Sequence, residues 1–138
     1  MCGIFGITEK NESLIRNLIS RCNHRGPDAS SIWSNQHLTL GHNLLSITSK
    51  VKDGIQPHVT QKGNILTYNG EIFNYDDLLK NFKNKFVPKT SCDTELLGWL
   101  LDNYNYDDVI CNIIDSMHSF VFFNKKNNEI VLSRDHAG

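Results

Sequence analysis

The order and type of the apolar segments predict an α+β fold whose sheets are mainly antiparallel. Short strand-like runs come first, segments with helical spacing of apolar residues dominate the middle, and two further strand-like runs close the chain. Strands grouped before and after helices, rather than alternating with them singly, are typical of layered α+β domains. The 138 residues contain no internal repeat and no linker-like stretch, so we expect one domain with a substantial core.

The first half of the chain predicts a strand, a helix and three more strands. "CGIFGIT" is short and mostly apolar, as expected of a buried strand. "SLIRNLISRC" places its four apolar residues on one face at helical spacing and predicts an amphipathic helix. "NHRGPDAS" interrupts this pattern with Gly and Pro and predicts a loop. Strands are then expected at Ile32–Ser34, Leu38–Ile47 and Asn64–Tyr68.

The second half predicts helices followed by a hairpin. Two helices are expected, with a shorter third one after them, at Tyr75–Phe82, Thr94–Tyr104 and near Asp107–Asp115. "HSFVFFN" and "EIVLSRD" are both strand-like and enclose the polar stretch "KKNN", a pattern typical of a β-hairpin.

Composition argues against several classes of function. The 14 Lys and Arg nearly balance the 15 Asp and Glu, with a formal net charge of −1, so nothing favours nucleic acid or a membrane surface as a partner. No signal-peptide pattern is present, and no apolar run reaches the roughly 18 residues needed to span a bilayer, so we expect a cytoplasmic protein. The cysteines show no paired spacing, so we expect reduced thiols and no metal site.

Cys2 is the candidate nucleophile. A start Met is removed when the next side chain is small, and removal here would leave a thiol and a free α-amine on one residue. Because the reference pKa of an α-amine is about 7.7–8.0, it can accept the thiol proton near neutrality, directly or through one water. The alternative is that Cys2 is only a small buried residue at the start of a strand.

Asn69 and Gly70, in "ILTYNGEIFNY", allow two interpretations. On its own, Asn-Gly between strand-like runs is a strong signal for a tight hairpin turn. Alternatively, the side-chain amide of Asn69 and the backbone N–H of Gly70 donate to one developing oxyanion. Donors of this kind contribute roughly 2.7–4 kcal/mol each in acyl transfer.

Asp93, in "KTSCDTELLGWLL", also allows two interpretations. Thr90 and Asp93 have the three-residue spacing of a capping box, which would give Asp93 a structural task at the start of a helix. The functional alternative is that the Asp93 carboxylate binds the ammonium group of a substrate.

These residues belong to a set of motifs that occur in one order along the chain. The set is Cys2, "HRGPD" at 24–28, "GHNLLSI" at 41–47, "QP" at 56–57, "NGEIFNY" at 69–75, "CDTE" at 92–95 and "RDHAG" at 134–138. With these motifs the chain resembles the glutaminase domain of the class II glutamine amidotransferases, and within them the asparagine synthetase branch. The resemblance covers essentially the whole chain. It implies an N-terminal-nucleophile hydrolase fold, a four-layer αββα sandwich of two mainly antiparallel sheets.

The resemblance also implies a mechanism. Cys2 would attack the side-chain amide carbonyl of glutamine with its own α-amine as the base, and Asn69 and Gly70 would form the oxyanion hole. Ammonia would leave, water would hydrolyse the γ-glutamyl thioester, and glutamate would depart. No metal or organic cofactor is needed. A separate ATP-using synthetase domain or subunit is the expected recipient of the ammonia.

Further residues are implied to bind the substrate. Asp93 would hold the α-amine of glutamine, while Glu71 and the backbone near Ile47 and Thr48 would line the pocket. Arg25 is expected in a loop that shapes the wall of the site.

Two departures from the family pattern are Leu44 and the segment 116–120, which reads Ser-Met-His-Ser-Phe where the family usually has Gly-Met-Phe-Ala-Phe. Leu44 stands where the family has an Arg that binds the α-carboxylate of glutamine. Losing one partner of a buried, hydrogen-bonded charge pair typically costs about 2–5 kcal/mol or more. Arg25 is the candidate replacement. The chain also stops at Gly138, short of the remaining segments of the family domain, so we expect either a minimal amidase-like protein or a fragment.

Three functions therefore remain open. The first is a glutamine amidohydrolase that supplies ammonia to a synthetase. The second is a catalytically impaired binding or regulatory domain of the same fold, which Leu44 favours. The third is an amidase for a substrate without an α-carboxylate, because Leu44 would make that corner of the pocket apolar.

Overall fold

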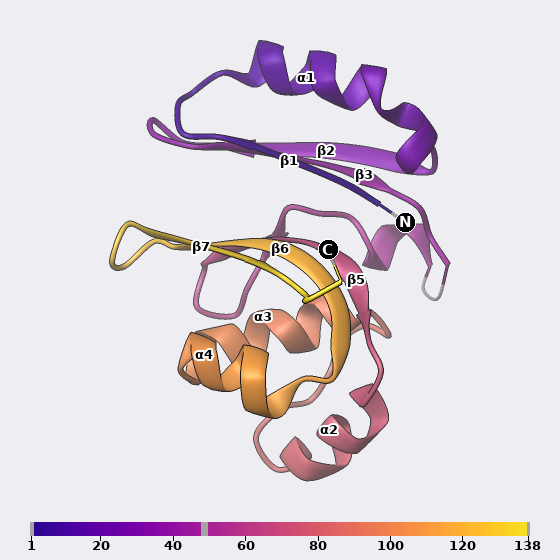
Figure 1. The fold of residues 1–138 in the computed structure, drawn as a ribbon, viewed down its shortest axis with the longest axis vertical. Helices are drawn as coiled ribbons and strands as arrows, with labels where there is room; N and C mark the ends of the chain where they lie inside the picture. The colour runs from indigo at the N-terminus through magenta and orange to yellow at the C-terminus, as the bar shows by residue number, and fades with distance from the viewer. Residues whose placement is uncertain (1, 48–49, 138) are drawn as a thin grey trace.

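The elements of the protein form four layers, two antiparallel sheets between two layers of helices (Figure 1). The computed structural model describes residues 2–47 and 50–137. Helix α1 (Glu12–Arg21) covers a three-stranded sheet, which lies over a four-stranded sheet whose far face is covered by the remaining helices. The expected α+β class and the αββα arrangement of two antiparallel sheets are confirmed.

The strand order is β1-β3-β2 in the first sheet and β4-β5-β6-β7 in the second. Within the described residues, every neighbouring pair of strands is antiparallel. The strands are β1 (Gly3–Ile7), β2 (Ala29–Ser34), β3 (Thr39–Leu44), β4 (His58–Val59), β5 (Ile65–Ile72), β6 (Ser116–Asn124) and β7 (Glu129–Arg134).

The helices beneath the four-stranded sheet follow β5 in the chain. They are α2 (Tyr75–Phe82), α3 (Asp93–Asn103) and the short α4 (Tyr106–Asp108), which continues into a π-helical turn, Val109–Ile113. Among the helices of the described residues, none has the length and apolar character needed to cross a membrane.

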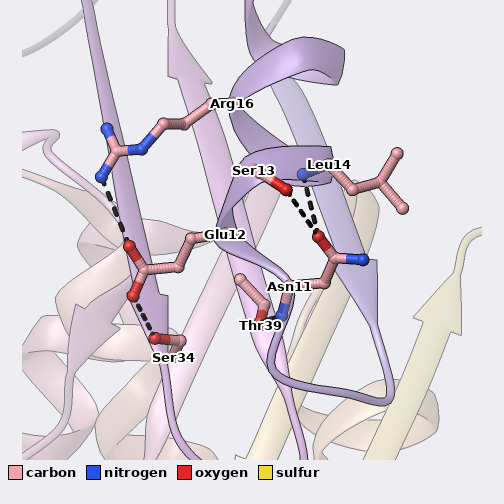
Figure 2. A network of polar contacts seen from close by, with 7 residues as sticks. All are labelled: Asn11, Glu12, Ser13, Leu14, Arg16, Ser34 and Thr39. Carbon is pink, nitrogen blue, oxygen red and sulfur yellow. Dashed lines mark hydrogen bonds and ion pairs between the residues drawn. The ribbon is translucent and has the colours of Figure 1, made fainter.

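Helix α1 begins in a polar network that also ties it to the sheet below (Figure 2). The Asn11 side chain caps the helix by accepting hydrogen bonds from Leu14 N and Ser13 Oγ, both at 3.0 Å. The Asn11 backbone N–H donates to Thr39 Oγ1 on β3 at 2.9 Å. On β2, the Ser34 hydroxyl donates to Glu12 in the first turn of the helix. These contacts fix the start of α1 over both strands.

The main core lies between the four-stranded sheet and helices α2 to α4. An aromatic cluster of Phe82, Phe86, Trp99 and Tyr104 fills one end of it, with ring centroids 5.1–5.8 Å apart. A smaller apolar cluster, Leu38, Leu40, Ile65 and Phe123, lies between the two sheets. The rest of that inter-sheet layer is more polar, and the candidate site lies there.

Several elements differ from the sequence prediction: β2 starts at Ala29 rather than Ile32, and β3 ends at Leu44 rather than Ile47. β5 continues to Ile72, so Asn69 and Gly70 lie within a strand, paired with Ser119 and His118 on β6, and the tight-turn interpretation of this pair is wrong. The two-residue β4 was too short to leave a pattern in the sequence. The short helix expected near residues 107–115 starts one residue earlier and changes from α-helical to π-helical geometry after three residues.

Candidate active site

A pocket opens between the two sheets, where the ends of β3 and β5 meet the chain start and the beginning of α3. It encloses about 680 Å³ of empty space, a value that includes the open solvent at its mouth. The lining residues are 2, 44–47, 54, 56, 68–71, 92–94 and 117. Segments far apart in sequence therefore converge on one hollow.

Cys2 lies at this pocket and is held from two sides. Its backbone N donates to Asn69 Oδ1 at 2.8 Å. Leu45 N donates to Cys2 Sγ at 3.3 Å, and Sγ lies 3.7 Å from Leu45 O. β1 supplies the chain end, β3 leads into the Leu45 contacts, and β5 carries Asn69. The sulfur is therefore positioned by both sheets.

Asn69 and Gly70 occupy the part of β5 that faces the pocket. Because Asn69 Oδ1 accepts the Cys2 hydrogen bond, Nδ2 is the donor that this amide can offer to a ligand. A Cβ at Gly70 would come within 2.2 Å of Met117 O, so a residue with a side chain would push β5 and β6 apart. Glycine is thus required here for the close approach of the strands.

Asp93 is the first residue of α3, and its carboxylate points back to β5. Its Oδ2 accepts hydrogen bonds from Ile72 N at 3.2 Å and from the Tyr68 hydroxyl at 3.3 Å. Burial raises the pKa of Asp93, these hydrogen bonds oppose that rise, and the nearby Glu71 carboxylate adds to it. Burial and the Asp93 charge also raise the pKa of Tyr68. Asp93 is therefore an oriented, partly desolvated carboxylate.

The Thr90–Asp93 capping box is wrong. Helix α3 is preceded by Cys92, which makes no side-chain capping bond. Thr90 instead donates its hydroxyl to Glu95 Oε2 at 2.9 Å, and the same carboxylate accepts from the backbone N–H groups of Lys89 and Thr90. Glu95 organises the loop before α3, so Asp93 is not engaged as a capping residue.

The sequence relatives identify the domain. The model of the glutamine amidotransferase domain family matches residues 1–138. The chain belongs to this family. It is 32% identical to "Asparagine synthetase [glutamine-hydrolyzing] 1" of Arabidopsis thaliana, with 100% of this chain and 24% of the relative covered.

Two other relatives come from distant organisms. Identity is 34% to the probable glutamine-hydrolyzing asparagine synthetase of Dictyostelium discoideum and 32% to a putative one of Methanocaldococcus jannaschii. All of this chain is covered in both comparisons, against 26% and 30% of the relatives. The amidotransferase domain described here therefore spans only about a quarter of the length of its curated relatives.

Of the other predicted site residues of this amidotransferase domain, some line the pocket and others do not. Leu44, Ile47 and Glu71 line the pocket; Leu44 is 5% exposed, whereas Ile47 is 75% exposed and lies at the mouth. Thr48 falls outside the described residues. Arg25 ends a short 3₁₀ turn, is exposed, and is not among the residues that line the pocket. Its role in carboxylate binding stays a prediction without a contact to support it.

Gln56 is a pocket residue whose role the sequence did not indicate. It is buried, accepts from Tyr68 N through Oε1 at 2.6 Å, and donates from Nε2 to Thr94 Oγ1 at 3.3 Å. It thereby ties β5 to the first turn of α3, beside Asn69 on one side and Asp93 on the other. Cys92 and Met117 also line the pocket without having been predicted.

No described part of the domain offers a metal centre. Within residues 2–47 and 50–137, no group of three or more His, Cys, Asp or Glu side chains is arranged to hold a metal ion. The four cysteines in that part of the chain form no disulfide with one another.

Proposed function

We propose that this amidotransferase domain releases ammonia from the side-chain primary amide of glutamine or a related amide, with Cys2 as an N-terminal nucleophile. The supporting observation is the 2.8 Å hydrogen bond from Cys2 N to Asn69 Oδ1, which puts the candidate nucleophile beside the candidate oxyanion donor in a pocket. Removal of Met1 would convert that nitrogen into a free α-amine.

The proposed reaction has two halves. The α-amine of Cys2 takes the thiol proton, and Sγ attacks the amide carbon while Asn69 Nδ2 and Gly70 N–H stabilise the oxyanion. The C–N bond breaks as the leaving nitrogen receives that proton, which releases ammonia and leaves a thioester. Water then attacks the thioester as the α-amine takes one of its protons, the C–S bond breaks, the sulfur receives that proton, and the carboxylic acid departs. Asp93 holds the ammonium group of the substrate throughout.

The ammonia passes to an ATP-using synthetase domain or subunit. Support comes from the relatives, which are named glutamine-hydrolyzing asparagine synthetases and are about four times as long as this chain. The reaction takes place in the cytoplasm, a reducing compartment that keeps the Cys2 thiol available for attack.

Ammonia release by the Cys2→Ala variant tests the nucleophile. We expect the variant to lose activity by about 10⁴-fold or more, because Cys2 is the thiol residue hydrogen-bonded to Asn69, whereas the Cys92 thiol, also in the lining, is buried and donates to Thr94 Oγ1 at 3.4 Å. Cys111→Ala is the matched control, since Cys111 is exposed and lies outside the pocket. Intact mass should show that Met1 is absent from the active protein. Unchanged activity in Cys2→Ala would rule the proposal out.

A second candidate function is a binding or regulatory domain that keeps the fold without turnover. The buried Leu44, in the place of the family arginine, is the observation that favours it. A glutamine-like electrophile distinguishes the two functions, because it labels Cys2 only if the thiol is activated beside a substrate pocket. Binding of an amide without labelling or ammonia release would support the second function.

A further inference from the structure

The charged residues lining the pocket are both acidic. Glu71 and Asp93 are in the lining, and no Lys, Arg or His is found among the lining residues that the structure describes. The residues that the structure does not describe are Met1, Thr48, Ser49 and Gly138, and none of them has a basic side chain. Lys50, the basic residue that directly follows Ser49 in the sequence, is exposed and is not among the residues that line the pocket. Apart from the α-amine that removal of Met1 would create on Cys2, this chain therefore offers the pocket two negatively charged side chains and no positively charged one.

An amine suits this environment, and a carboxylate does not. Burial and the neighbouring Glu71 raise the pKa of Asp93, which means that its negative charge is poorly solvated and would be stabilised by a cation. The carboxylate of free glutamine would be repelled by both acidic groups and would lose water without gaining a partner.

Leu44 also indicates that the pocket does not suit a carboxylate, and it does so independently of the charged residues. It is the last residue of β3, where its pairing with Ala29 on β2 and the hydrogen bond from Asp28 N to Leu44 O hold its backbone in place. On this strand Leu40 and Leu44 share the face toward the second sheet, so the Leu44 side chain is directed between the sheets. The pocket thus has a fixed apolar wall, which suits a hydrocarbon or neutral group.

From these features we infer that the preferred substrate is an ω-amide that carries a free amine but no free carboxylate. This inference rests on the proposed function and narrows its substrate. The primary amide would meet Cys2, the ammonium group would meet Asp93, and the apolar wall at Leu44 would contact the part of the molecule where glutamine has its carboxylate. 4-Aminobutanamide, which is glutamine without the carboxylate, and glutamine α-amide, in which it is neutralised, represent the class.

The test compares kcat/KM for ammonia release from glutamine, 4-aminobutanamide and glutamine α-amide, with the deamidated product of the last identified by chromatography against glutamine and isoglutamine, which have the same mass. We expect the two carboxylate-free amides to exceed glutamine by roughly 30-fold or more, the size expected for a charge without its buried partner. Leu44→Arg should reverse that order. Leu132→Arg is the matched control, because Leu132 is 72% exposed on β7 and outside the pocket, and it should leave the order unchanged.

Binding to the Cys2→Ala variant separates this inference from the proposed function. Calorimetry with 4-aminobutanamide and with glutamine, each at millimolar concentration, reports recognition without chemistry. Tighter binding of 4-aminobutanamide supports the inference even if the wild-type protein releases no ammonia. Tighter or equal binding of glutamine, or no binding of either compound, overturns the inference, and it does so even if Cys2-dependent ammonia release is established.

Discussion

The two faces of the four-stranded sheet serve different purposes, and β5 shows the difference within one strand. Leu66 and Tyr68 face helices α2 to α4 and belong to the large apolar core. Ile65, Thr67 and Asn69 alternate with them and face the other sheet, where the apolar cluster is small and the polar character increases toward Cys2. The helix-covered face holds most of the apolar core, whereas the inter-sheet face carries Cys2 and Asn69; the site reaches the helix side only at its edge, where Tyr68 contacts Asp93.

Buried polar atoms sharpen this contrast. Nε2 of His42 and Oγ1 of Thr67 are buried in the inter-sheet region and have no hydrogen-bond partner among the described residues. An unsatisfied buried polar group costs about 1–3 kcal/mol. The layer next to the pocket is therefore less optimised for stability than the core beneath the helices, as is expected where residues are chosen for chemistry rather than packing.

Truncating adjacent phenylalanines on β6 compares the two faces directly and should give the largest change in stability. Phe122 is fully buried in the helix-covered core, and Phe123 is 4% exposed in the small inter-sheet cluster. Phe122→Ala should lower the free energy of unfolding by about 3–5 kcal/mol, as large core truncations do. Phe123→Ala should cost less, because fewer buried apolar neighbours surround it.

Denaturant unfolding monitored by circular dichroism measures both values. The comparison fails if Phe123→Ala destabilises the protein as much as Phe122→Ala, since the inter-sheet layer would then be as well packed as the core.

The pH dependence of stability should reveal the buried His42. Burial lowers its pKa from 6.5 to about 4, although hydrogen bonding to the Tyr68 backbone partly opposes this. The folded protein therefore binds fewer protons than the unfolded chain between these values, and its stability falls as the pH drops from about 6.5 to 4. The largest loss attributable to this histidine is about 3 kcal/mol, from 1.36 kcal/mol per pKa unit.

Unfolding free energies measured across this range for wild type and His42→Gln isolate the effect. Wild type should lose stability relative to His42→Gln as the pH falls from about 6.5 to 4. His37→Gln, which changes an exposed histidine, should follow the wild-type curve. Parallel curves for wild type and His42→Gln would show that this histidine is not desolvated in the folded state.

The sequence predicted those parts of the fold that local periodicity controls. Helix α2 occupies the predicted range Tyr75–Phe82, and α3 starts and ends one residue earlier than expected, because each has an apolar face at helical spacing. The strand over Asn69 and Gly70 could not be predicted locally. An Asn-Gly pair favours a turn, but here eight consecutive pairs with β6 override that preference.

Predicting the site depended on long-range contacts. Cys2 and Asn69 are 67 residues apart, and the resemblance to a family placed both in one site, whereas no local pattern could. Gln56 stayed without a role because its partners, Tyr68 N and Thr94 Oγ1, become its neighbours only in the folded protein. Asp93 was given a capping alternative from its spacing, but Glu95, two residues later, is the carboxylate that binds Thr90.

The smallest expected change in stability comes from comparing two buried threonines, one whose hydroxyl has no hydrogen-bond partner and one whose hydroxyl has two. Thr67→Val removes the partnerless Oγ1 of a fully buried side chain and should raise the free energy of unfolding by about 1 kcal/mol. Thr60→Val is the matched control. The Thr60 hydroxyl donates to Asp102 Oδ1 at 2.9 Å and accepts from Asn64 N at 3.1 Å, so its removal should cost about 1–3 kcal/mol.

Opposite signs for these two valine variants in thermal unfolding would confirm that the inter-sheet layer carries unsatisfied polarity near the pocket. If Thr67→Val is destabilising instead, its hydroxyl has a partner such as a buried water, and the polar part of the inter-sheet layer is a satisfied network. The inter-sheet layer would then contribute less stability than the helix-covered core only because its apolar cluster is smaller. The two faces of the sheet would differ in packing rather than in unsatisfied polar groups.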